Sequence, residues 1–116
     1  MTGIGIDVVS IKRFEGKTEG FFQKYFSKAE LEYAKSRKSF FETIAGIFAL
    51  KEAFLKAIGV GVFKGIKLSE LEVRHKESGE PYLVVSEKVL KKFNINQVLS
   101  SISHDGAVAV AVCQVN

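Results

Sequence analysis

Two acidic side chains stand where an acid is unexpected, and both could take part in metal or phosphate chemistry. Asp7 follows a strand-like segment in which Gly3 and Gly5 alternate with apolar residues. Glu52 lies within a largely apolar segment of helical periodicity. Oxygen ligands from two separate elements suit Mg²⁺, which completes its octahedron with water and substrate phosphates. Asp7 and Glu52 are therefore a candidate metal pair, although a helix cap at Asp7 and an i,i+4 ion pair between Glu52 and Lys56 are the commoner explanations of such a pattern.

Basic residues and a histidine could bind phosphate near this pair. Lys51 and Lys56 share the helical segment of Glu52, and a turn containing Gly61 could direct backbone N–H groups towards a phosphate. For each lysine taken separately, a solvated ammonium group on a packed stem is the simpler interpretation. His104 is predicted to lie in a turn between two strands, where it could bind a ligand or orient the turn through the acid that follows it.

The elements that must position these residues follow from periodicity and from helix and turn signals. Residues 3–9 predict a strand with a bare face, which would make Asp7 accessible. Ser27 and Glu30 have the spacing of a capping box, and residues 16–20 are predicted to be a polar break. The other predicted helices span 10–14, 28–37, 41–58 and 86–93, and the other predicted strands span 71–75, 81–85, 97–103 and 107–114.

These elements predict an α+β fold, in which a mostly antiparallel sheet packs against a long central helix and shorter helices. Gly59 is expected to end the long helix, and residues 104–106 are expected to form the turn of the last hairpin. In the final strand the valines face one way and the alanines the other, so one face should allow close packing.

The composition indicates a single domain over residues 1–116, located in the cytoplasm. The chain is 47% hydrophobic, and its longest apolar segment is interrupted by charged residues, so no membrane span or membrane partner is expected. A chain this short could complete a deep site with a second copy of itself. The single cysteine, Cys113, is expected to be a small buried hydrophobe.

The net charge of +4 favours an acidic partner without identifying its class. A non-catalytic nucleic-acid-binding domain is one alternative, but most of the ten phenylalanines have the spacing of core residues, not of a stacking surface. We therefore expect no nucleic-acid partner. A structural oligomer without catalytic activity is the other alternative.

Five motifs, in order and at matching spacing, closely resemble the holo-acyl-carrier-protein synthase family. They are GIDVV at 5–9, FSKAE at 26–30, FALKEAFLKAIGVG at 48–61, GEP at 79–81 and SISHD at 101–105. The resemblance implies a 4′-phosphopantetheinyl transferase fold, a homotrimer with sites between subunits, and the use of Mg²⁺ and coenzyme A. The implied reaction transfers 4′-phosphopantetheine to a serine of apo acyl carrier protein, releases 3′,5′-ADP and supports fatty-acid biosynthesis.

The same resemblance implies a catalytic group of Asp7, Glu52 and Lys56. Asp7 and Glu52 would hold the metal, and Lys56 would contact a coenzyme A phosphate. Phosphoryl-type transfer depends mainly on positioning and charge stabilisation, so these few groups could suffice. The base that accepts the serine proton stays open between Glu52, a metal-bound water and a lysine.

Four further positions are assigned by the resemblance alone. Lys51 and Gly61 would lie in the coenzyme A pocket, His104 would hold the nucleotide portion from a neighbouring subunit, and Arg13 would contact the acidic helix of the carrier protein. A basic enzyme with two acidic partners agrees with the net charge.

Two departures from the family pattern affect these assignments. Ile47 occupies a position that is often arginine in the family, so one phosphate contact is either missing or supplied by Lys64, Lys67 or another subunit. Residues 15–20 are also shorter and less basic than the corresponding segment of many relatives, which leaves Arg13 as the one residue assigned to the carrier protein.

Overall fold

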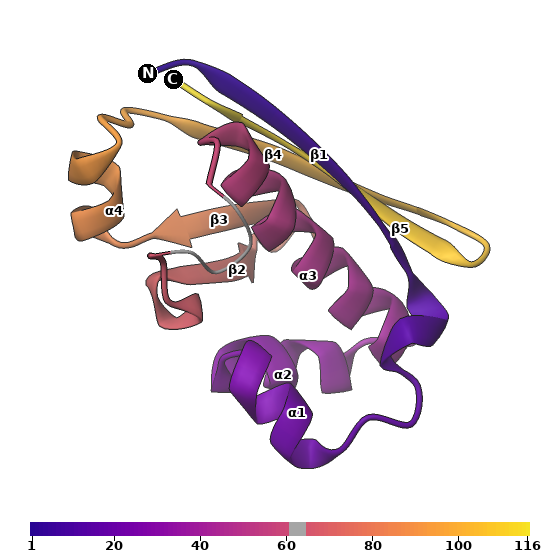
Figure 1. Cartoon of the computed structure of the whole chain (residues 1–116). Helices are drawn as coiled ribbons and strands as arrows, with labels where there is room; N and C mark the ends of the chain where they lie inside the picture. Colours follow the sequence, from indigo (N-terminus) through magenta and orange to yellow (C-terminus); the bar gives the residue numbers. More distant parts are fainter. Residues whose placement is uncertain (61–64) are drawn as a thin grey trace.

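The computed structural model describes residues 1–60 and 65–116, apart from the side chain of Leu68. It is an α+β fold in which helix α3 lies at the centre (Figure 1). The strands are β1 (Gly3–Ser10), β2 (Leu71–His75), β3 (Pro81–Val85), β4 (Val98–Asp105) and β5 (Val108–Val115). The helices are η1 (Ile11–Phe14), α1 (Glu19–Tyr25), α2 (Lys28–Ser36), α3 (Phe40–Ala57), η2 (Leu68–Glu70) and α4 (Glu87–Lys92).

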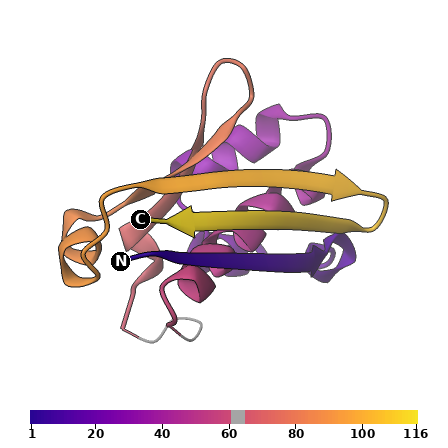
Figure 2. The same cartoon turned by 90° about the horizontal axis from the view of Figure 1, so that it is seen from above.

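The strands form two antiparallel sheets. One sheet has the order β1-β5-β4, and β2 pairs with β3 in the other. Figure 2 shows β1, β5 and β4 side by side with α3 beneath them. Because α3 packs mainly against β1 and β5, this helix and the inner face of the larger sheet form the centre of the hydrophobic core. The predicted fold class is confirmed.

The glycine-spaced face of β1 is buried, which corrects the prediction that it is accessible. An added Cβ at Gly3 would lie 2.0 Å from the backbone oxygen of Ala57, and one at Gly5 would lie 2.0 Å from that of Ala53. Only a residue without a side chain permits this approach of strand to helix. Asp7 shares the face and is 8% exposed. The face that looked apolar in the sequence points outwards, and Ile6 on it is 62% exposed.

Strand β5 uses small side chains in the same way, as predicted. Ala109, Ala111 and Cys113 point towards α3 and are buried. Burial raises the pKa of the Cys113 thiol to about 12, so this cysteine is a packed and unreactive side chain, also as predicted.

The long helix is confirmed, one residue earlier at each end than predicted. Ser39 caps its N-terminus by accepting a hydrogen bond from the Glu42 backbone N–H at 3.3 Å. Gly59 follows its C-terminus with φ of 77°, a conformation that favours glycine. The capping box of α2 is confirmed, since Ser27 and Glu30 each accept a hydrogen bond from the other's backbone N–H.

Two local predictions were wrong. Helix α1 begins at Glu19, inside the predicted polar break, because Thr18 accepts a hydrogen bond from the Phe21 N–H and caps the helix. Strand β4 continues through Asp105, so Gly106 and Ala107 form the turn of the hairpin, and not residues 104–106. His104 therefore lies in a strand.

Among the described residues, no helix combines the length and the apolar character that a membrane crossing requires.

Candidate functional site

Packing of β1 on α3 brings Asp7, Glu52 and Lys56 together, and we call these three residues the acidic site. Glu52 and Lys56 lie one turn apart on α3, and Asp7 lies on the inner face of β1. Lys56 Nζ donates a hydrogen bond to Asp7 Oδ1 at 3.0 Å and another to the backbone oxygen of Ile6 at 3.1 Å. The glycines of β1 make this geometry possible, because they allow the strand to approach the helix.

The two carboxyl groups of the acidic site are electrostatically linked. Burial, a side-chain hydrogen bond with Asp7 and the charge of the Asp7 carboxyl raise the pKa of Glu52 to about 7, while the positive charges of Arg13 and Lys56 act in the opposite direction. Asp7 Oδ2 is buried and has no hydrogen-bond partner among the described residues. An unpaired buried carboxylate oxygen is costly, so the site has an unused capacity for one more positive group.

This arrangement fits Mg²⁺. Two carboxylates reach the same place from separate elements, and one of their oxygens lacks a partner. The described residues contain no group of three or more His, Cys, Asp or Glu side chains that could hold a metal ion. Magnesium sites that use one or two carboxylates have this character, because water and substrate phosphates supply the remaining ligands.

Arg13 lies on η1 at the edge of the acidic site. Its guanidinium carbon is 4.8 Å from the centre of the Phe48 ring, which gives this exposed side chain a cation–π support. Its charge also lowers the pKa of Glu52. The structure therefore places the residue assigned to the carrier protein beside the candidate metal pair.

Lys51 has a structural partner, which argues against its predicted contact with coenzyme A. Its side chain is 3% exposed, and its ammonium group lies 2.7 Å from Glu30 Oε1. Glu30 Oε2 also accepts a hydrogen bond from the Val73 N–H at 2.8 Å. The pair joins α2, α3 and β2 inside the core. From the sequence, Glu30 was expected only to cap a helix. Its pairing with Lys51 could not be predicted, because the two residues are far apart in the chain and meet only in the folded protein.

Two of the positions discussed from sequence, Gly61 and Lys64, lie outside the described residues. Ile47 is described and is 1% exposed within the core. The isoleucine at this position therefore belongs to the hydrophobic packing of α3 and is not available to bind a phosphate. Lys67 is exposed and has no ion pair among the described residues.

His104 lies at the other end of α3, at a cavity of about 670 Å³. His104 Nε2 is 3.0 Å from the backbone oxygen of Glu42, and Nδ1 is 3.8 Å from the Glu42 carboxylate. The cavity is lined from α2, α3, the β2–β3 pair and β4, and we call it the cationic cavity. Its polar and aromatic lining includes Tyr33, Arg37, Lys38, Glu42, His75 and His104.

The acidic site and the cationic cavity are separate places on one chain. Glu42 and Glu52 are ten residues apart on α3, which corresponds to about 15 Å along the helix axis. The structure therefore brings Asp7, Glu52 and Lys56 together but does not bring His104 to them within the chain.

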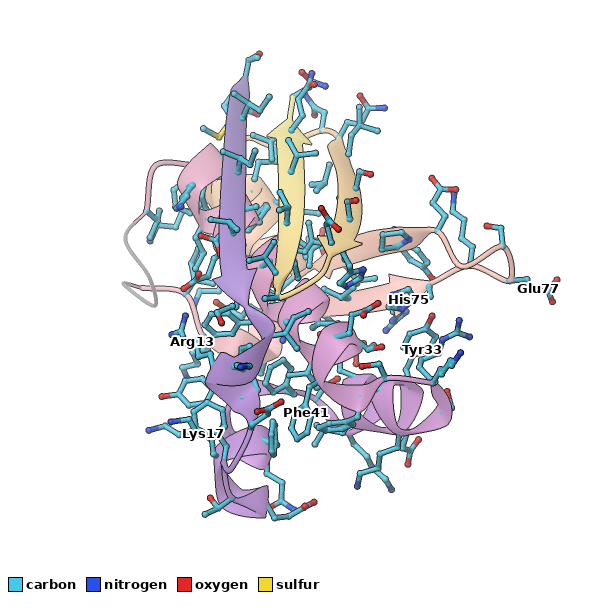
Figure 3. The ribbon with its side chains drawn as sticks, turned by 90° about the vertical axis from the view of Figure 1, so that its right-hand side faces the viewer. Arg13, Lys17, Tyr33, Phe41, His75 and Glu77 are labelled. Carbon is cyan, nitrogen blue, oxygen red and sulfur yellow. The ribbon has the colours of Figure 1, made fainter. Side chains whose placement is uncertain are left out.

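Three lining residues of the cationic cavity were not singled out from the sequence. The Tyr33 and His75 rings are stacked, with centroids 3.8 Å apart and an angle of 6° between their planes. The guanidinium group of Arg37 lies over the Tyr33 ring, with its central carbon 5.6 Å from the ring centroid. Figure 3 shows Tyr33 and His75 side by side and Arg13 well away from them. The stack joins α2 to β2, so no local sequence signal could reveal it.

The aromatic residues near the N-terminus pack against one another. Phe14, Phe22, Phe26 and Phe48 are all buried, and Phe14 contacts Phe26 and Phe48 edge to face. These four rings are therefore core residues, as their spacing predicts, and are not available to stack on bases.

Known proteins share this sequence and this fold. The family model described as the 4′-phosphopantetheinyl transferase superfamily matches residues 3–113. The holo-[acyl-carrier-protein] synthase of Fusobacterium nucleatum is 43% identical over 116 residues, covering 95% of this chain and 94% of the relative. The synthase of the same name from Clostridium botulinum is 41% identical over 114 residues, covering 94% and 92%.

Solved structures agree. The Helicobacter pylori holo-[acyl-carrier-protein] synthase in complex with coenzyme A superposes with a TM-score of 0.88 at 35% identity, covering 97% of this chain and 99% of that one. The Bacillus anthracis synthase in complex with CoA (3′,5′-ADP) gives 0.82 at 35% identity, covering 97% and 94%. On this agreement of sequence and fold, the chain belongs to the holo-[acyl-carrier-protein] synthase family of the 4′-phosphopantetheinyl transferase superfamily.

Proposed function

We propose that this protein transfers 4′-phosphopantetheine from coenzyme A to a serine of apo acyl carrier protein, with Mg²⁺, and releases 3′,5′-ADP. The observation that carries the proposal is the acidic site, where two linked carboxyl groups, a lysine and an unpaired buried oxygen meet. The names of the relatives and the coenzyme A complexes of two similar structures support the choice of substrates.

Within the acidic site each residue has a distinct part. Asp7 and Glu52 would hold Mg²⁺, which neutralises charge on the pyrophosphate and makes its phosphorus more electrophilic when it is bound. Lys56 already points its ammonium group at Asp7, and its side chain is about half exposed, so it can also donate to a pyrophosphate oxygen. Positioning and charge stabilisation of this kind account for most of the catalysis in such transfers.

Arg13 would meet the carrier protein next to the acidic site. Lys17, between η1 and α1, and Lys24, on α1, extend its positive charge. Each lies over an aromatic ring, with ammonium nitrogens 5.3 Å from the Phe21 centroid and 5.4 Å from the Tyr25 centroid. Cations held over rings offer a preformed surface to carboxylates, and they favour fast association with an acidic protein.

The outer face of the larger sheet supports the proposed homotrimer. Ile4, Ile6 and Val8 on β1 and Leu99 on β4 are large apolar side chains that are exposed on this single face. An apolar sheet face of this kind is typical of a surface covered in an assembly. Copies of the chain are the proposed occupants, since the cationic cavity and the acidic site lie about 15 Å apart along α3 and one ligand could be shared across a subunit boundary.

The cellular setting completes the proposal. A holo carrier protein is the form that carries acyl chains, so the enzyme would support fatty-acid biosynthesis in the cytoplasm.

Intact-mass spectrometry of apo acyl carrier protein, incubated with this protein, coenzyme A and Mg²⁺, tests the proposed reaction. We expect a mass gain of one phosphopantetheine group with the wild type and no gain with the Asp7→Ala, Glu52→Ala double variant. No gain with the wild type, across several carrier proteins, would contradict the transferase proposal and favour the inactive oligomer. Sedimentation equilibrium of the same preparation tests the trimer.

A further inference from the structure

Lys56 is directed at strand β1 and not at its acidic neighbour on α3. Its ammonium nitrogen lies 3.0 Å from Asp7 Oδ1 and 3.1 Å from the backbone oxygen of Ile6, and both acceptors belong to β1. Glu52 lies one turn away on the same helix, yet the only ion pair of Lys56 among the described residues is the one with Asp7. The lysine therefore serves the buried acid, and not the acid that the i,i+4 spacing suggested.

Asp7 needs this cation, because its carboxylate is buried beside a second acid. Its side chain is 9% exposed, and Oδ2 has no hydrogen-bond partner among the described residues. It faces Glu52, so the charged forms of the two carboxyl groups repel each other. A buried charge without an opposite charge is strongly destabilising. Lys56 therefore supplies positive charge at the place where the proposed function needs a divalent cation.

The two lysines of α3 differ in how firmly they are enclosed. Lys51 is 3% exposed and its partner Glu30 is fully buried, so that pair cannot open without breaking the core. The side chain of Lys56 is 55% exposed, and its ammonium group ends a flexible aliphatic stem. The bond to Asp7 can therefore open while the packing of β1 on α3 stays intact. A lysine of this kind is suited to exchange between two anionic partners.

We propose that Lys56 is the resident counter-ion of Asp7 in the metal-free protein, and that it competes with Mg²⁺ for this carboxylate until an anionic substrate draws the ammonium group away. The inference rests on the proposed function, since it concerns the metal and the pyrophosphate that the acidic site is proposed to bind. It gives Lys56 a part before the reaction begins. The protein without substrate keeps its buried acid neutralised and binds Mg²⁺ weakly.

The competition has a sign that distinguishes it from simple support of the site. A divalent cation and an ammonium group at the same carboxylate repel each other, because the site is partly buried and poorly screened. Removal of Lys56 should therefore tighten Mg²⁺ binding to the free protein. If the lysine only kept Asp7 and Glu52 in place, its removal should weaken that binding. The linkage is reciprocal, so Mg²⁺ should also release Lys56 from Asp7.

Calorimetric titration of Mg²⁺ into the full-length protein, without coenzyme A, tests the inference. The titrations are done at pH 8.5, above the pKa of about 7 of Glu52, so that protons compete little for the site. Lys56→Met removes the charge and keeps an apolar stem, while Lys56→Arg keeps the charge. Lys35→Met is the matched control, because it removes the lysine of an exposed ion pair with Glu19. Thermal unfolding in EDTA establishes that each variant is folded.

We expect Lys56→Met to bind Mg²⁺ at least about fivefold more tightly than the wild type, as the removal of one cation beside a partly buried carboxylate implies. Lys56→Arg should show no such gain, and Lys35→Met should stay within about twofold of the wild type. In EDTA, Lys56→Met should unfold about 5 °C or more below the wild type, and Mg²⁺ should recover most of this loss. The Asp7→Asn, Lys56→Met double variant should unfold above Lys56→Met in EDTA and lose the response to Mg²⁺.

A measurement on the wild type covers the case in which Lys56→Met does not fold. NMR follows the ε-methylene resonances of Lys56 and Lys35, which are assigned from Lys56→Arg and Lys35→Met. Mg²⁺ without coenzyme A should shift the Lys56 resonance over the concentrations that saturate the calorimetric binding, whereas the Lys35 resonance should not move.

Three results would overturn the inference. Weaker or unchanged Mg²⁺ binding by Lys56→Met would show that the lysine supports the site or does not act on it, and would leave the transferase proposal standing. An unmoved Lys56 resonance in the titrated wild type would have the same meaning. Absence of Mg²⁺ binding in both the wild type and Lys56→Met would remove the inference together with the metal of the proposed function.

Discussion

The two ends of helix α3 carry sites of opposite construction. At the acidic site, β1 lies against the helix backbone, Asp7 is buried, and Lys56 is already hydrogen bonded to it. At the cationic cavity, half-buried and exposed side chains from several elements line an open space, and Arg37 and His75 have free polar groups. The first site is a product of core packing, so changes there should affect stability and chemistry together. The cationic cavity lies at the surface, outside the hydrophobic core, so changes there should affect binding and not stability.

The Lys51–Glu30 pair, which ties the core beneath both sites, should give the largest effect. We expect Lys51→Met to lower the free energy of unfolding by about 3–5 kcal/mol, because it leaves Glu30 charged and buried without its partner. Urea unfolding measures this loss. The Lys51→Met, Glu30→Gln double variant is the control and should recover part of the stability. A folded and stable Lys51→Met protein with weakened coenzyme A binding would instead restore the role implied by the family resemblance.

Gly5→Val tests whether the acidic site depends on close packing. A Cβ at this position would lie 2.0 Å from the Ala53 oxygen, so β1 must move away from α3 and stability should fall by about 3 kcal/mol. Gly20→Ala is a matched control, since its nearest neighbour is the Thr18 hydroxyl at 3.8 Å, and it should be neutral or slightly stabilising. Denaturant melts compare the two. Equal stability of both variants would contradict the close-packing argument.

Glu52→Gln should separate chemistry from binding. Removing one of the two carboxylates should reduce kcat by at least about 100-fold, which corresponds to about 2.7 kcal/mol of transition-state stabilisation. Arg37→Gln should instead raise KM for coenzyme A with kcat within about threefold of the wild type. Initial rates of carrier-protein modification over a range of coenzyme A concentrations distinguish the two. A large fall of kcat in Arg37→Gln would mean that the two ends of α3 act as one site.

The pH dependence of stability should show the smallest effect, and its sign is set by Glu52. Its pKa is raised from 4.5 to about 7, so the folded protein binds more protons than the unfolded chain between these values. Stability without metal should therefore fall as pH rises through this window, by on the order of 1 kcal/mol after allowance for solvent screening. Thermal unfolding from pH 4.5 to 8 in EDTA measures it.

Two comparisons check the origin of that slope. Glu52→Gln should flatten it, because an amide does not titrate. Added Mg²⁺ should stabilise the wild type more at pH 8 than at pH 5.5, because the cation competes with the proton for the same carboxyl groups. A slope that persists unchanged in Glu52→Gln would assign it to another group.

Local signals in the sequence predicted most of the elements. The bounds of β2 and β3 were predicted to the residue, and the capping box of Ser27 and Glu30 marked the start of α2. The predicted α3 was displaced by one residue. Helix α1 was missed because its glycine-containing start resembles a turn, while the hydrogen bond to Thr18 that begins it is a single weak signal.

The residues of the acidic site could be proposed from sequence because an acid in an apolar environment is unusual wherever it falls. Asp7 and Glu52 stood out for this reason, whereas the role of Lys56 was implied only by the family resemblance. The sequence could not show which face of β1 is buried, since glycines resemble an empty face until a helix is known to lie there. The sequence also could not show that Lys51 and Lys56 have different environments. Lys51 is buried in the core with Glu30, whereas Lys56 forms an ion pair with Asp7.

The sequence by itself determined the α+β class, the order of elements and the residue types of the acidic site, because periodicity, caps and turns are local properties of the chain. Only the tertiary structure decided the buried face of β1, the Lys51–Glu30 pair and the cationic cavity. Each of these joins residues that are distant in sequence, such as Tyr33 on α2 and His75 on β2. Their contact depends on how helices and strands pack, and packing has no signature in any one segment.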